Sequence, residues 1–106
     1  MELRTYPRFR VQFRSTFTGH KIEGEGKATD LSQGGCRIES DVSIPASTTL
    51  EMRLYVPGLD WPMRVEQAAV KWARGGEFGL EFVRILPDEE KTLHTVVKDL
   101  KSDEGE

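Results

Sequence analysis

A chain of 106 residues is one domain's worth of sequence, because ordinary domains run to roughly 100–150 residues. Its hydrophobic residues, 37% of the total, recur regularly enough for a small core, and its single cysteine, Cys36, excludes a disulfide within the chain. The charged N-terminus and the lack of an apolar run approaching about 20 residues argue against a signal peptide and against membrane insertion. We therefore expect a cytoplasmic protein.

The formal net charge of −3 hides two oppositely charged ends. Residues 1–14 carry four arginines and one glutamate, whereas residues 87–106 carry seven acidic residues and three lysines. Arginines suit an anionic ligand, because the planar guanidinium binds phosphate through paired hydrogen bonds. The acidic remainder would repel a long polyanion, so we expect no long nucleic acid as a partner.

Alternation of apolar and polar residues predicts a chain made mainly of β-strands. The alternating runs lie at residues 8–14, 36–41, 50–56, 63–72 and 78–82. A one-residue slip of the apolar phase near Gln67 predicts a β-bulge in the fourth run. Residues 21–29 are the weakest strand candidate, and Gly24 and Gly26 favour a close backbone approach there, at a barrel corner.

Turn residues separate these runs at spacings typical of a small closed barrel or a sandwich. After Pro87 the apolar period becomes that of an amphipathic helix, with acidic residues in its first turn and lysines towards its end. We expect one C-terminal α-helix at residues 87–101 and a disordered acidic tail at residues 102–106.

No group of residues has a spacing typical of catalysis or of a metal site. His20 falls in an expected turn and His94 on the polar side of the expected helix, so both are predicted to be solvated. Cys36 has no histidine near it in the sequence and is expected to be a small buried hydrophobic residue. We expect no enzyme, no metal and no cofactor.

Two short motifs give the strongest functional signal: RxxxR from Arg4 to Arg8, and DxSxxG from Asp30 to Gly35. In this order, with these strands, they resemble the PilZ domain, a bacterial receptor module for cyclic di-GMP. The resemblance extends to the strands at residues 70–72 and 79–82 and to the closing helix, so it covers nearly the whole chain. It implies an all-β fold, a six-stranded antiparallel PilZ-like β-barrel with one C-terminal α-helix.

The resemblance also implies a domain layout and a binding site. A single domain would span residues 1–101, with an arginine switch segment at 1–8, the barrel at 8–86 and the helix at 87–101. Cyclic di-GMP would lie on the outer face of the barrel, between the two motifs. The implied ligand-binding residues are Arg4, Arg8, Asp30, Ser32, Gly34 and Gly35.

Each of these residues has a chemical reason to bind such a ligand. Arg4 and Arg8 would each meet a guanine face or a phosphate, and Asp30 would accept hydrogen bonds from the N1–H and amine edge of guanine. Ser32 would supply a hydroxyl nearby. The glycine pair that ends the second motif would pass close beneath the ligand, with dihedral angles that a side chain would forbid.

Structural alternatives exist for several of these residues. Asp-x-Ser ahead of two glycines is also a common turn, in which the side chains cap their own backbone. A second RxxxR match at residues 10–14 lies inside a strand, on a solvated face, so Arg4 and Arg8 are taken as the motif. Trp61 and Trp72 are expected in the core rather than in the site.

These features together predict a non-enzymatic receptor that orders residues 1–8 on binding and presents the new surface to an unidentified effector protein. Leu3 stands where many members of the family have another arginine, which favours one ligand per chain. One alternative is a ligand-independent PilZ-like protein-interaction adaptor. Another is a barrel that binds short single-stranded nucleic acid.

Overall fold

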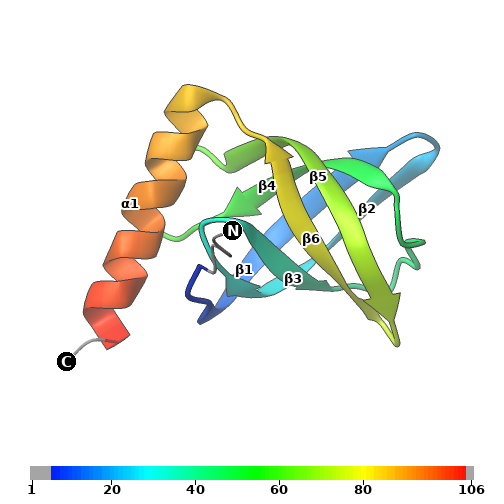
Figure 1. Ribbon diagram of the computed structural model, residues 1–106, viewed down its shortest axis with the longest axis horizontal. Helices are drawn as coiled ribbons and strands as arrows, with labels where there is room; N and C mark the ends of the chain where they lie inside the picture. Colours follow the sequence, from blue (N-terminus) through cyan, green and yellow to red (C-terminus); the bar gives the residue numbers. More distant parts are fainter. Residues whose placement is uncertain (1–5, 105–106) are drawn as a thin grey trace, which may run out of the picture.

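The computed structural model describes residues 6–104, which form six strands followed by one helix (Figure 1). The elements are β1 (Phe9–Gly19), β2 (Ile22–Leu31), β3 (Gly35–Glu39), β4 (Thr49–Tyr55), β5 (Met63–Arg74), β6 (Glu77–Arg84) and α1 (Pro87–Glu104). The predicted mainly-β class with a C-terminal helix is confirmed.

The strands close into an antiparallel barrel in the order β1-β2-β3-β6-β5-β4, and β4 pairs back with β1. Closure leaves no free sheet edge, because every strand has a hydrogen-bonded neighbour on both sides. Most strands that follow each other in the sequence are neighbours in the barrel. The exception among residues 6–104 is the pair β3 and β4, which are joined by residues 40–48 but are not adjacent. Helix α1 stands beside the barrel rather than inside it, and contacts β5 and β1 (Figure 1).

The inward-facing residues of the strands fill the barrel. Phe17 and Phe78 belong to this core and meet edge to face, with their ring centroids 5.4 Å apart. Leu93 and Val96, on one face of α1, add to the same core, as the helical spacing predicts. Burial of these side chains supplies the main driving force for folding.

The weakest strand candidate is a full strand, β2, and its glycines lie where the backbone of another segment comes close. A Cβ atom at Gly26 would lie 2.2 Å from the carbonyl oxygen of Glu39, and one at Gly24 would lie 2.7 Å from a methyl carbon of Val42. Side chains at these positions would therefore push the neighbouring segment away. The predicted close approach is confirmed.

Two irregularities shape β5. Leu50 pairs with Ala68 but Met52 pairs with Val65, so an extra residue sits between them and the bulge predicted near Gln67 is confirmed. A second register shift lies between Val70 and Trp72. Because of this shift, the alternation of inward-facing residues in β5 stops before Trp72. The prediction that Trp72 lies in the core was therefore wrong.

Helix α1 runs three residues further than predicted. The prediction of a disordered tail was wrong for residues 102–104, which continue the helix. Between Pro87, the first residue of the helix, and Gly105 the sequence contains no glycine or proline, so the hydrogen-bonded turns can extend to Glu104. Residues 105–106 lie outside the described part of the chain. No helix among residues 6–104 has both the length and the apolar character needed to cross a membrane.

Candidate ligand-binding site

Ser32 builds the turn that joins β2 to β3. Its hydroxyl oxygen accepts hydrogen bonds from the N–H groups of Gly34 and Gly35, each at 3.1 Å, and its own N–H donates to the Gly35 carbonyl at 2.9 Å. The side chain is buried, with 3% of the residue exposed. Ser32 therefore adopts the capped turn that the sequence offered as a structural alternative, and its hydroxyl is engaged with its own backbone.

Gly34 and Gly35 are needed for space rather than for unusual dihedral angles. Neither has a positive φ, so that part of the sequence prediction was wrong. A Cβ atom at Gly35 would lie 2.1 Å from the carbonyl oxygen of Leu80 on β6, and one at Gly34 would lie 2.9 Å from the ring of Tyr6. Gly35 permits the barrel to close, and Gly34 leaves room for the segment that precedes β1.

Arg8 and Asp30 join the two motifs in space. Phe9 pairs with Leu31 across β1 and β2, which brings Arg8, the residue before β1, to the outer face beside Asp30. The Arg8 Nη1 atom donates to the Asp30 Oδ1 atom at 2.9 Å, although the residues are 22 positions apart. The Arg8 side chain is 58% exposed and that of Asp30 is 15% exposed. Arg4, the other arginine of the motif, lies outside the described residues.

Arg37 completes this charged cluster and was missed by sequence reasoning. It lies opposite Asp30 in the β2–β3 ladder, with its Nε atom 3.7 Å from Asp30 Oδ2 and 3.5 Å from Glu77 Oε1. The same Nε–H donates to the hydroxyl of Thr29 at 3.1 Å. If the DxSxxG motif is assumed to be the turn of a hairpin, counting residue pairs outwards from this turn places Arg37 opposite Asp30.

These residues line an open pocket of about 640 Å³ on the outer face of the barrel. Its other walls come from β5 and β6, which adds residues that the motifs do not contain. The lining residues are Tyr6, Arg8, Asp30, Ser32, Gly34, Cys36, Arg37, Lys71, Trp72, Gly79, Leu80 and Glu81. Three cations, two carboxylates and two aromatic rings thus face one space.

Trp72 forms an aromatic wall of this pocket. The bulge in β5 turns it outwards, and its indole lies over Gly79, where a Cβ atom would be 2.2 Å from Nε1. The Arg74 guanidinium lies 5.6 Å from the ring centroid, within the range of a cation–π contact. The residue is 37% exposed, so part of the ring surface is available to a ligand.

Cys36 lies beneath the pocket and is buried, as predicted. Burial raises the pKa of its thiol far above the ordinary value, the Asp30 carboxylate raises it further, and Arg8 lowers it. The sulfur is therefore a neutral thiol near pH 7 and lacks the thiolate that nucleophilic chemistry requires.

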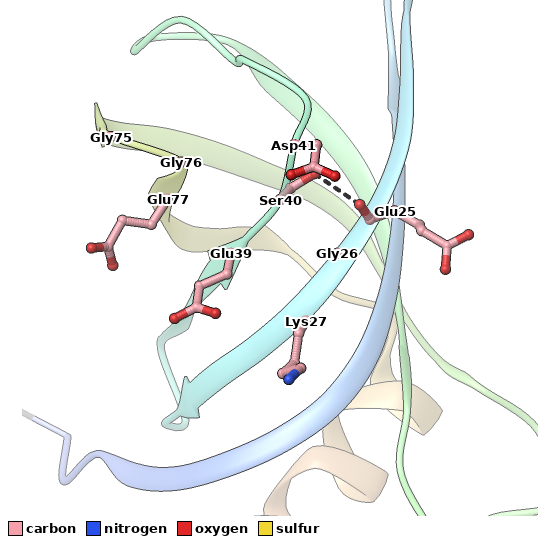
Figure 2. Close-up of a pocket in the computed structure, with 9 residues that line it drawn as sticks. All are labelled: Glu25, Gly26, Lys27, Glu39, Ser40, Asp41, Gly75, Gly76 and Glu77. Carbon is pink, nitrogen blue, oxygen red and sulfur yellow. Dashed lines mark hydrogen bonds between the residues drawn. The ribbon is translucent and has the colours of Figure 1, made fainter.

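A second pocket, of about 510 Å³, has the opposite electrostatic character (Figure 2). Glu39, Asp41, Glu77 and Lys27 line it, together with Glu25, whose side chain points away from the pocket in Figure 2. Figure 2 shows the Glu39 and Glu77 carboxylates and Lys27 in this region, and the Ser40 hydroxyl donates to the Glu25 carbonyl at 2.8 Å. An anionic ligand would be repelled here, so the pocket between the motifs is the candidate anion site.

The structure is thus a closed six-stranded barrel with a cationic, aromatic pocket on its outer face. The PilZ domain family model matches residues 2–99, and the chain belongs to this family, whose members are generally cyclic di-GMP receptors. The comparisons indicate no enzyme family. None of the curated proteins compared with the chain matches it significantly in sequence.

Two solved structures share the fold. The Bacillus subtilis inhibitor of motility, MotI/DgrA, superposes with a TM-score of 0.77 at 16% sequence identity, covering 98% of this chain and 54% of that one. The chain thus spans about half the length of that protein. The PilZ domain of CeSA from a cellulose-synthesizing bacterium superposes with a TM-score of 0.71 at 17% identity, covering 90% of this chain and 98% of that one.

Proposed function

We propose that the chain binds cyclic di-GMP in the pocket between its two motifs and passes the binding event on to a partner protein. The observation that carries this proposal is the Arg8–Asp30 contact, which brings the two motifs into one pocket. The buried, unpaired Cys36 fits the reducing conditions of the cytoplasm, where we place the protein.

The charges and rings of the pocket match the chemistry of this ligand. Arg8, Arg37 and Lys71 supply cationic donors for two phosphates, and Arg4 would add a fourth. The Asp30 carboxylate can accept from the N1–H and amine edge of guanine. The exposed surface of Trp72 offers a face on which a base can stack.

Binding would rearrange the charges that the free protein pairs internally. Asp30 is held between Arg8 and Arg37, so a guanine that engages Asp30 releases Arg8 to bind a phosphate or a guanine face. Residues 1–8 would then be held over the barrel by Arg4 and Arg8. This ordering creates a surface that a partner can read. With Leu3 in place of an arginine, the proposal is one ligand per chain.

Calorimetric titration of cyclic di-GMP tests the proposal, with GTP as the ligand control. Arg8→Ala and Asp30→Asn should each weaken binding at least about tenfold, because a hydrogen bond to a charged group contributes about 1.5–3 kcal/mol. Arg84→Ala is the matched control, since Arg84 is similarly exposed and is ion-paired with Glu66 at 2.8 Å, but lies outside the pocket. It should bind like the unchanged protein.

Other outcomes contradict the proposal in distinguishable ways. If the unchanged chain produces no binding heat, the ligand-independent adaptor takes its place. If Asp30→Asn strengthens binding and the affinity falls steeply with salt for many sequences of short single-stranded nucleic acid, the chain is a nucleic-acid platform. A stoichiometry of two ligands per chain would overturn the inference from Leu3.

A further inference from the structure

Trp61 lies on a surface that the ligand pocket does not use. It belongs to the segment of residues 56–62, which joins β4 to β5 and lies beside the first turns of α1. The residue is 81% exposed, and its neighbour Leu59 is 38% exposed. The prediction that Trp61 lies in the core was therefore wrong, because the residue belongs to a loop and not to a strand with alternating buried residues. A tryptophan so exposed leaves a large apolar ring in water.

Two grooves flank this loop where it meets α1. Trp61 lines the first, of about 280 Å³, together with Leu59, Pro62 and Met63. The second, of about 560 Å³, has an apolar lining that includes Phe13, Val56 and Leu100, and it also contacts Lys91 and Asp99. Leu59 and Thr92 line both grooves, so the grooves adjoin and together make a strip of which Trp61 lines the first part.

The rim beside Trp61 is acidic. Asp60, Asp88 and Glu89 line the first groove, and among the described residues no lysine or arginine does so. Glu89 also fixes the shape of this groove, because its Oε1 atom accepts a hydrogen bond from the Arg64 N–H at 3.0 Å and ties α1 to the start of β5. The surface is thus formed in advance, which lowers the entropic cost of binding.

We propose that this strip, defined by Leu59, Trp61 and the acidic rim, docks a basic segment of a partner protein that carries an apolar anchor residue. A membrane surface is the other common partner of an exposed apolar patch. The three carboxylates beside Trp61 argue against it, because they would repel anionic lipid headgroups. Tryptophan is enriched among the residues that dominate protein–protein affinity. The proposal goes beyond ligand binding, because none of these residues lines the cyclic di-GMP pocket.

An NMR titration of the full chain tests the docking surface with a defined probe. The probe is a synthetic 15-residue peptide with leucines along one helical face and lysines elsewhere, and its twin carries glutamates in place of the lysines. We expect saturable shifts of the amides at residues 59–61 and in the first turns of α1 with the lysine peptide only. Absence of these shifts, or equal binding of the glutamate peptide, overturns the proposal.

Substitutions locate the contact and separate it from ligand binding. Trp61→Ser should weaken peptide binding at least about tenfold, as for an interface anchor. Asp60→Asn with Asp88→Asn should also weaken peptide binding, because it removes two of the three carboxylates that line the first groove. Val83→Ser removes another exposed apolar side chain, outside both grooves, and should leave the peptide affinity within twofold. Equal peptide affinities of the Trp61→Ser and Val83→Ser proteins would refute the contact.

The remaining occupants are distinguished by two measurements. Trp61-dependent sedimentation with phosphatidylglycerol vesicles would overturn the proposal in favour of a lipid surface. Concentration-dependent dimerisation that Trp61→Ser abolishes would overturn it in favour of a second copy. Trp61→Ser should leave cyclic di-GMP affinity unchanged and Arg8→Ala should leave peptide affinity unchanged, so failure of either proposal is recognised separately.

Discussion

Replacing Gly35 with alanine should open the contact between β3 and β6. The new Cβ atom would lie 2.1 Å from the Leu80 carbonyl oxygen, well inside the closest approach of such atoms. Both groups belong to the backbone of a closed barrel, so no side-chain rotation can relieve the overlap. The two strands must therefore separate by roughly 1 Å at this point, which is an overpacking strain in a region without slack.

The expected cost follows from the contacts at this position. Overpacking costs about 1–3 kcal/mol, and separation also weakens the hydrogen bond from Phe82 N–H to the Gly34 carbonyl, 2.9 Å long. We expect the free energy of unfolding to fall by about 3 kcal/mol, a large share of the 5–15 kcal/mol typical of a domain. For a chain of this size the melting temperature should fall by roughly 12–24 °C.

Urea unfolding followed by circular dichroism measures this loss, and Gly34→Ala is the control in the adjacent position. Its Cβ atom would meet the Tyr6 ring at 2.9 Å, and the half-exposed ring can move, so the expected loss is under about 1 kcal/mol. The reasoning is refuted if Gly35→Ala costs less than Gly34→Ala. A fall of less than about 1 kcal/mol for Gly35→Ala, at an unchanged denaturant slope, would also refute it.

Three further substitutions probe the core, the thiol and the pocket wall. Ser15→Ala should raise stability by about 1 kcal/mol in urea unfolding, because the buried Ser15 hydroxyl has no hydrogen-bond partner among the described residues; a loss would indicate a bound water. Burial raises the pKa of Cys36, so its contribution to stability is complete below the unfolded pKa near 9 and is lost as pH rises above it. Between pH 8 and 10.5 the free energy of unfolding measured in urea should therefore fall more steeply for the unchanged protein than for Cys36→Ala, by up to about 1.4 kcal/mol per pH unit. Parallel curves for the two proteins would refute this. Trp72→Ala should weaken cyclic di-GMP binding about tenfold by calorimetry, since stacking on one base contributes about 1–3 kcal/mol, while Trp61→Ala should not.

Local patterns in the sequence were sufficient to predict the strands and the first bulge. A strand that is buried on one face alternates apolar and polar residues, so the slip of phase at Gln67 is visible without a structure. The close approach at Gly26 was equally visible, because a strand with no side chains on one face leaves room for another backbone. These features depend on a few neighbouring residues, which is why they could be predicted.

The pocket wall could not be predicted in this way. Trp72 continues the inward phase of Val70 in the sequence, and only the register of β5 against β6 reveals the irregularity that turns it outwards. Arg37 likewise looks like an ordinary solvated strand residue until its partner across the hairpin is known to be Asp30. Both positions depend on the register of a hairpin, which the alternation within a single strand does not reveal. For Arg37, counting outwards from the DxSxxG turn would have supplied that register.

The residues of the DxSxxG motif divide into two groups by what they contact. Ser32 and Gly35 face inwards: one caps the turn and the other permits β3 to meet β6, so their loss should damage the fold and the ligand pocket together. Asp30 faces outwards with Arg8, and in the proposed complex its carboxylate would bind the ligand in place of Arg8. A chain that lost only Arg8 and Asp30 would keep the barrel and the Trp61 surface, because neither depends on that ion pair. A ligand-independent adaptor can therefore arise from this design by changes on the outer face alone, whereas changes at Ser32 or Gly35 would lower the stability of the barrel that carries the docking surface.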